Sequence, residues 1–169
     1  MNKHAANVVG TFLTVLFCAG GIALAHALSR HALFADWHGF ALLASVIVLI
    51  PLHEALHALG LLRYAKVSRA DIRFGVMWRA LMPYCHCTVP ISVCAYRRMA
   101  LLPLWVTGTA TVGLLVLFPA DWLGCLAGVA LAACIGDVWL VLKLRRFTGD
   151  LFVKDCPSEI GCDVYSASP

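Results

Sequence analysis

Pro51-Leu52-His53-Glu54-Ala55-Leu56-His57 is the stretch that decides how this chain is built, because it sets ionisable side chains inside an apolar run. The run extends from Phe40 to Leu62 and is long enough to cross a membrane as a helix. On such a helix His53 and His57, four residues apart, share one face. Ionisable groups within a membrane span are costly and usually serve a function.

The stretch has the pattern H-E-x-x-H, in which two imidazoles at helical spacing can bind one zinc ion. Glu54 lies next to this pair around the helix, where its carboxylate can take a proton from water held by the metal. The alternative is a pair of helix-packing histidines with Glu54 as their hydrogen-bond partner. The apolar neighbours favour the metal site over this alternative.

The composition predicts a membrane protein. Of the 169 residues, 62% are hydrophobic and 13% are charged, and the mean hydropathy is +0.86. Soluble domains carry roughly 45–50% apolar and about 25% charged residues. The basic residues flank apolar runs and form no stripe with interleaved aromatics, so nucleic acid is not an expected partner. The expected partner is the lipid bilayer.

Four apolar runs predict an all-α polytopic membrane protein with four transmembrane helices in a single domain over residues 1–169. A small β-hairpin is expected between the second and third helices, from the strand-like stretches Ile72–Trp78 and Tyr84–Val89. One exposed edge of this hairpin could pair with an extended peptide, or the hairpin could only cover the helix ends. The expected spans are 8–28, 40–62, 100–120 and 122–142, followed by a tail over 143–169.

The basic residues predict the orientation of these spans. With both termini inside, twelve of the thirteen Lys and Arg residues lie on the inner side, and only Arg30 lies outside. The positive-inside rule therefore favours cytoplasmic N and C termini. We expect an integral protein of a bacterial inner membrane. Cysteines on the inner side, including Cys85 and Cys87, are expected to be free thiols.

Asp137 is the expected third zinc ligand, since it is the one acidic residue within the fourth span. His53 lies roughly 20 Å along its span and Asp137 roughly 22 Å along its own, from the helical rise per residue. These two spans run in the same direction, so the ligands fall at a similar depth. Asp137 could instead pair with a hydroxyl group or a histidine. Weaker ligand candidates, which could fold back from loops, are His86, Asp155 and Glu159.

The tail is expected to dock beside the metal site. Asp155 can start a turn, Pro157 restricts the backbone, and Gly161 permits a left-handed residue. The residues that could bind substrate or support the active site are Asp155, Pro157 and Glu159 of the tail, together with His86 of the expected hairpin. The alternative is a flexible tail on the membrane surface.

These residues resemble the DUF3267 family of short membrane proteins, which is classed as a zincin peptidase family from its metal motif. The resemblance rests on His53-Glu54-x-x-His57 in a membrane helix and on the tail pattern Asp155-x-Pro157-Ser158-x-x-Gly161, and it extends from about 49 to 165. More distantly, the chain resembles the site-2 protease type of intramembrane zinc peptidase. It lacks that group's N-x-x-P-x-x-x-x-D-G sequence around Asp137 and its inserted PDZ domain.

The resemblance implies a zinc metallopeptidase that cleaves a membrane-associated peptide or protein. The residues themselves suggest the corresponding roles, with zinc held by His53, His57 and Asp137 and with Glu54 as general base. Two other functions stay open from the sequence. One is a non-catalytic membrane protein that binds zinc, and the other is a membrane zinc hydrolase that acts on a lipid or another amide.

Overall fold

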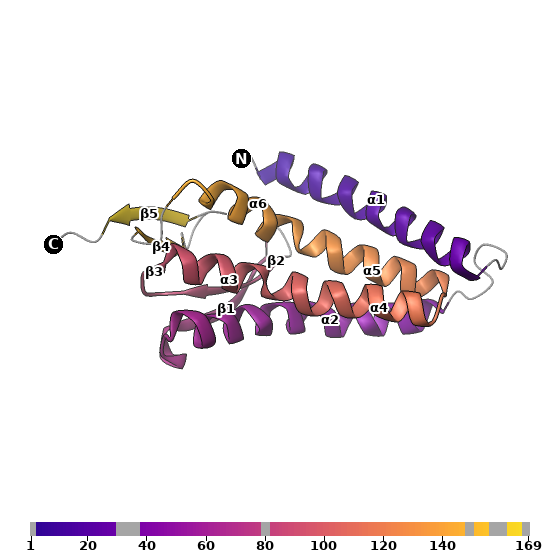
Figure 1. Cartoon of the computed structure of the whole chain (residues 1–169), viewed down its shortest axis with the longest axis horizontal. Helices are drawn as coiled ribbons and strands as arrows, with labels where there is room; N and C mark the ends of the chain where they lie inside the picture. Colours follow the sequence, from indigo (N-terminus) through magenta and orange to yellow (C-terminus); the bar gives the residue numbers. More distant parts are fainter. Residues whose placement is uncertain (1–2, 30–37, 79–81, 148–150, 156–161, 167–169) are drawn as a thin grey trace. The chain divides into compact units, whose positions relative to one another are not determined.

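Helices form most of the chain, and the strands of two small sheets lie between the second and third spans and after the fourth. The computed structural model describes residues 3–29, 38–78, 82–147, 151–155 and 162–166 (Figure 1). The helices are α1 Lys3–Ser29, α2 Gly39–Gly60, α3 Val93–Pro103, α4 Thr109–Leu117, α5 Asp121–Ala133 and α6 Ile135–Leu144, with short helical turns η1 Leu61–Ala65, η2 Arg69–Asp71 and η3 Leu104–Gly108. The strands are β1 Ile72–Met77, β2 Met82–Cys87, β3 Ile91–Ser92, β4 Leu151–Asp155 and β5 Cys162–Ser166.

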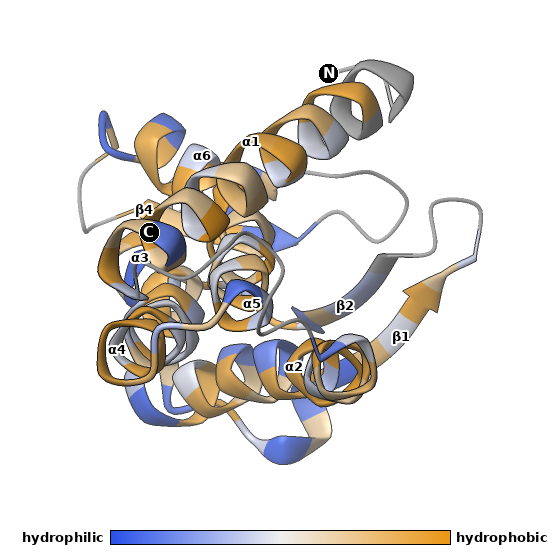
Figure 2. Cartoon of the chain, turned by 90° about the vertical axis from the view of Figure 1, so that its right-hand side faces the viewer, coloured by the Kyte–Doolittle hydropathy of each residue, from blue (hydrophilic) through white to orange (hydrophobic). Residues whose placement is uncertain are grey.

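Four helical segments are long and apolar enough to cross a membrane, as the composition predicted. They are Val8–Ser29, Gly39–Ala65, Val93–Leu117 and Asp121–Leu144. The third begins at Val93, earlier than the expected residue 100, because α3 starts directly after β3 and Pro103 lies at its end. In Figure 2 the ribbons of α1 and α4 are mostly orange, and many of their large apolar side chains are exposed. Lipid is the solvent that such surfaces suit.

Two of the spans are interrupted helices. In the third, a π-helical turn η3 follows Pro103, whose missing N–H and ring disrupt regular α-helical hydrogen bonding. In the fourth, α5 ends at Ala133 and α6 begins at Ile135, with Cys134 between them. By contrast, α2 continues as an α-helix through Pro51.

The chain divides into two compact units, of which the first comprises residues 1–50 and 104–135. Its main contact joins α1 to α5, which lie side by side in Figure 1. The helices approach closely at glycines: a Cβ on Gly21 would collide with the Gly124 backbone, and one on Gly128 with that of Cys18. Small residues allow such close helix packing in membranes.

The second unit comprises residues 51–103 and 136–169, and it contains all the candidate site residues that the structure describes. Its core surrounds three fully buried side chains, Leu61, Val93 and Val153. The hairpin expected from the sequence is confirmed: β1 pairs antiparallel with β2, and Phe74 lies opposite Cys85.

The all-α expectation needs one correction, because the tail forms a second sheet with the order β3-β4-β5. In it, β4 pairs antiparallel with both neighbours, with Val153 opposite Ile91 on one side and Val164 on the other. Val153 is completely buried in the core of the second unit. Apolar residues that alternate with polar ones suit a strand with one buried face, so the described strands of the tail pack against the core.

Candidate metal centre

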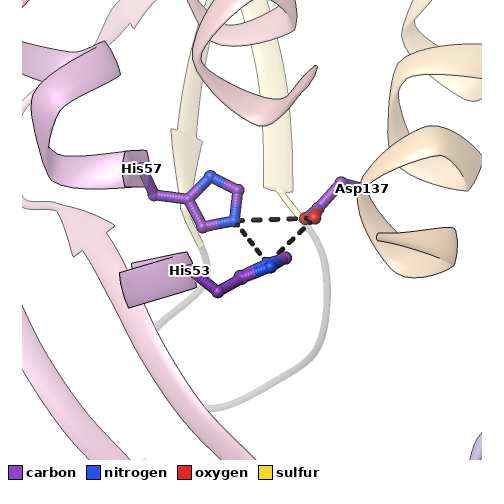
Figure 3. Close-up of side chains that lie close together, drawn as sticks. All are labelled: His53, His57 and Asp137. Carbon is purple, nitrogen blue, oxygen red and sulfur yellow. Dashed lines mark hydrogen bonds and ion pairs between the residues drawn. The ribbon is translucent and has the colours of Figure 1, made fainter. Parts of the chain in front are cut away.

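The side chains of His53 and His57 face each other across a single turn of α2. They are four residues apart, both are buried, and their rings lie edge to face with centroids 4.8 Å apart. Their Nε2 atoms are separated by 3.1 Å, and Figure 3 shows both rings directed at the same point. The helical spacing therefore brings two nitrogen donors together, as the sequence predicted.

The backbone of α3 orients His57. Its Nδ1 lies 3.4 Å from the carbonyl oxygen of Met99. A carbonyl can only accept, so this contact places the proton on Nδ1 and leaves the Nε2 lone pair free. The close approach depends on Gly60, where an added Cβ would lie 2.8 Å from the Met99 Cα.

Asp137 completes the group from the first turn of α6. Its Oδ2 lies 3.3 Å from Nε2 of His53 and 3.5 Å from Nε2 of His57 (Figure 3). The break at Cys134 puts this carboxylate near a helix N-terminus, where exposed N–H groups favour negative charge. The sequence predicted that Asp137 would meet the histidines, but the helix break itself was not expected. An added Cβ on Gly136 would meet no atom of the described residues within 4 Å.

The three donor atoms have the spacing that a tetrahedral metal ion requires. Their separations are 3.1, 3.3 and 3.5 Å. Zinc bonds of about 2.0–2.1 Å in tetrahedral geometry keep ligand atoms roughly 3.3–3.4 Å apart. The Oδ2 atom of Asp137 is buried and has no hydrogen-bond partner among the described residues. A cation between these lone pairs would satisfy all three, so the donor set fits zinc.

Glu54 lies beside this group and does not join it. Its half-buried carboxylate interacts electrostatically with the two histidines and with Asp137, and it accepts a hydrogen bond from the backbone N–H of Cys85 on β2. The Cys85 thiol also lies near the Glu54 carboxylate. Burial first, and then the nearby carboxylates of Glu54 and Asp155, raise the pKa of that thiol to about 12. The hairpin thus holds the Glu54 carboxylate in place.

Asp155 is bound to the same edge of β2. Its Oδ2 accepts a hydrogen bond from the Cys87 N–H at 3.1 Å, and its Oδ1 accepts one from the Tyr96 hydroxyl at 2.7 Å. Cys85 and Cys87 are two residues apart on one strand, so both N–H groups point away from β1. Asp155 therefore joins β4 to the strand that contacts Glu54.

Other expected residues lie elsewhere or outside the described residues. His86 stacks on Tyr84 with ring centroids 5.4 Å apart, and strand alternation directs its side chain away from the face shared by Cys85 and Cys87. It does not belong to the described group of potential metal ligands. Pro157 and Glu159 lie outside the described residues.

Sequence reasoning missed the Met99 carbonyl, the Cys85 N–H and the Tyr96 hydroxyl. The first two are backbone groups, which no residue type identifies. Tyr96 had a weak signal, as a polar aromatic residue between Cys94 and Arg97 at the start of an apolar run. A buried tyrosine hydroxyl usually finds a hydrogen-bond partner.

Comparison with known proteins agrees with this geometry. A family model with the description "Putative zincin peptidase" matches residues 46–151, which include Glu54 and the three potential ligands. No curated protein and no solved structure matches the chain significantly. The matched range covers more than half of the chain, and the chain belongs to the DUF3267 family.

Proposed function

We propose that this protein is an intramembrane zinc metallopeptidase that hydrolyses a peptide bond of a membrane-associated protein. One observation carries the proposal: two imidazole nitrogens and a carboxylate oxygen form a triangle with zinc-ligand spacing, next to the carboxylate of Glu54. The H-E-x-x-H residues lie in a helix that is apolar enough to cross a membrane. Family membership supports the peptidase class.

In this proposal, His53, His57 and Asp137 hold the zinc ion. A bound zinc ion supplies Lewis acidity, which polarises a carbonyl group and makes water a stronger acid. Glu54 accepts a proton from the attacking water and later donates it to the leaving amine nitrogen. The Cys85 N–H keeps the carboxylate aimed at the same place for both transfers.

The number of ligands favours catalysis over a structural role. Structural zinc sites are closed by four protein ligands, whereas catalytic sites use three and leave one position open. In the described part of the chain, the group has three ligand side chains. This argues against the non-catalytic zinc protein that the sequence left open, but a lipid or another amide is still an alternative substrate.

The edge of β2 serves the active site in this proposal and does not pair with substrate. Its outward backbone donors at Cys85 and Cys87 are already bound to Glu54 and Asp155, and Pro83 has no N–H to offer. A substrate strand could not pair there without displacing both carboxylates. A substrate helix would still have to unwind near the metal, since a helical backbone shields its carbonyl groups.

We place the protein in a bacterial inner membrane with both termini in the cytoplasm. Support comes from the four apolar helices and from the basic residues, twelve of thirteen of which would lie on the inner side in this topology. The site residues lie in α2 and α6, in the second halves of two spans that lead into the basic segments. Water would then reach the metal from the cytoplasm.

The direct test compares wild-type protein with Glu54→Gln, both purified with zinc and incubated with a library of membrane peptides. The variant should keep its zinc and lose hydrolysis, because Glu54 acts as a base and not as a ligand. Equal cleavage by both proteins would exclude the proposed base. Release of fatty acid from lipids without cleavage of any peptide would support the lipid hydrolase instead.

A further inference from the structure

The last turn of α6 carries a surface feature that the metal centre does not use. A pocket of about 280 Å³ is lined by two apolar and three basic side chains, namely Trp139, Leu142, Lys143, Arg145 and Arg146. On the helix, Trp139, Leu142 and Lys143 share one face, since they are separated by three and four residues. The pocket therefore combines apolar and cationic side chains.

The side chains of this pocket are exposed and point away from the core. Trp139 is 52% exposed and Leu142 is 48% exposed, while Leu144 on the other side of the helix is buried. The Lys143 ammonium lies 5.2 Å from the centroid of the Trp139 ring, so a cation–π contact joins a basic and an apolar side chain of the pocket. None of the described carboxylates forms an ion pair with Lys143, Arg145 or Arg146.

The backbone that presents the basic residues is held from inside the unit. The Arg97 guanidinium of α3 donates from Nη2 to the carbonyl oxygens of Leu144 and of Phe147, the second at 2.9 Å. These bonds satisfy carbonyl groups at the helix C-terminus, which otherwise lack partners. Arg145 and Arg146 lie between the two bonded carbonyls, so their backbone position is fixed before any ligand binds.

We infer that this pocket binds the phosphate group of an anionic phospholipid. Lys143, Arg145 and Arg146 supply the charge, and arginine in particular matches phosphate oxygens in a bidentate manner. Trp139 and Leu142 would lie against the glycerol and upper acyl region, where tryptophan concentrates in membrane proteins. A soluble phosphate compound would gain nothing from these apolar side chains.

Location and size favour the same ligand. The basic residues end a helix that is apolar enough to cross a membrane, which is where lipid headgroups lie. The volume of about 280 Å³ is just below the roughly 300–1,000 Å³ typical of small-molecule sites, which suits a headgroup. Asp137 lies in the first turn of the same helix, so the lipid would hold the far end of the element that carries the metal ligand.

The test measures lipid binding to the purified full chain by native mass spectrometry, with phosphatidylglycerol as the anionic probe and phosphatidylcholine as the neutral one. Replacement of Lys143, Arg145 and Arg146 by glutamine should weaken phosphatidylglycerol binding by about tenfold or more. The matched control replaces Arg63, Lys66 and Arg69, which are exposed beyond α2, and should bind like the wild type. Lys143→Arg keeps the charge and should also bind.

Three outcomes would overturn the inference. Equal losses in the two triple variants would show that net charge alone attracts the lipid. Equal binding of the neutral and anionic lipids would remove the role of the basic residues. Displacement of the lipid by soluble glycerol phosphate at equal concentration would make this a site for soluble phosphates. Zinc content and thermal stability of each variant show whether it is folded.

Discussion

The Nδ1 atom of His57 lies 3.4 Å from the carbonyl oxygen of Met99, and this contact ties a candidate metal ligand on α2 to the backbone of α3. It exists because Gly60, one turn further along α2, has no side chain to hold Met99 away. Orientation of a ligating histidine by a carbonyl group fixes the tautomer and the ring direction. The position of the metal site therefore depends on a glycine that has no contact with the metal.

Gly60→Ala should lower both stability and zinc affinity. The added Cβ would lie 2.8 Å from the Met99 Cα, so backbone must move, at a cost of about 1–3 kcal/mol. Gly136→Ala is the matched control, since its Cβ would meet no atom within 4 Å. Thermal unfolding and zinc titration measure the two effects. Wild-type zinc affinity in Gly60→Ala would show that the Met99 contact does not orient His57.

Purified protein should contain about one zinc ion per chain. His53→Ala, His57→Ala and Asp137→Ala should each weaken zinc binding by at least the roughly 10–100-fold that loss of an outer partner costs. His86→Ala is the control, because His86 stacks on Tyr84 and is not part of the group. Metal analysis after dialysis measures the content. Full zinc in both single-histidine variants would remove the central claim.

Asp155→Ala should impair hydrolysis while zinc content stays near normal. The change removes two hydrogen bonds to a carboxylate, each worth about 1.5–3 kcal/mol, and frees the β2 edge that holds Glu54. Tyr96→Phe removes one of the two and should have a smaller effect. Asp163→Ala, in the exposed part of β5, is the control. If the variant instead loses its zinc together with its activity, Asp155 supports the metal ligands and not the general base Glu54.

Stability should fall above pH 9 through Cys85. Burial and the neighbouring carboxylates raise its pKa from 9.0 to about 12, so the folded thiol stays protonated while the unfolded one ionises. Its contribution is complete below pH 9 and is lost as the pH rises toward 12. Cys85→Ser should flatten this part of the pH dependence of the melting temperature, and Cys94→Ser should not. Identical curves for wild type and Cys85→Ser would contradict the prediction.

Membrane orientation can be tested by labelling single cysteines in a cysteine-free background. Arg69→Cys and a cysteine added at the C-terminus should react only from the cytoplasmic side, and Arg30→Cys only from the opposite side. An impermeant maleimide applied to whole cells and to inverted membranes gives the two readouts. Reaction of the Arg69→Cys protein in intact cells would reverse the proposed topology.

Local sequence determined much of the fold and the outline of the site. Four apolar runs gave four membrane-length helices, because hydropathy over a span needs no tertiary information. The spacing of His53 and His57 placed both on one helix face. The match in depth pointed to Asp137, since helical rise converts residue count into distance. The hairpin β1–β2 followed from the strand-like stretches Ile72–Trp78 and Tyr84–Val89.

Only the tertiary structure decided what surrounds these ligands. The Met99 carbonyl and the Cys85 N–H act through the backbone, and every residue carries such groups, so the sequence cannot single them out. The second sheet depends on pairing of β4 with β3, which lie far apart in the chain, and long-range pairing leaves little local signal. The helix break before Asp137 also has no local signal, because no proline causes it. It lies where the chain passes from the first unit, which ends at Ile135, to the second, which resumes at Gly136.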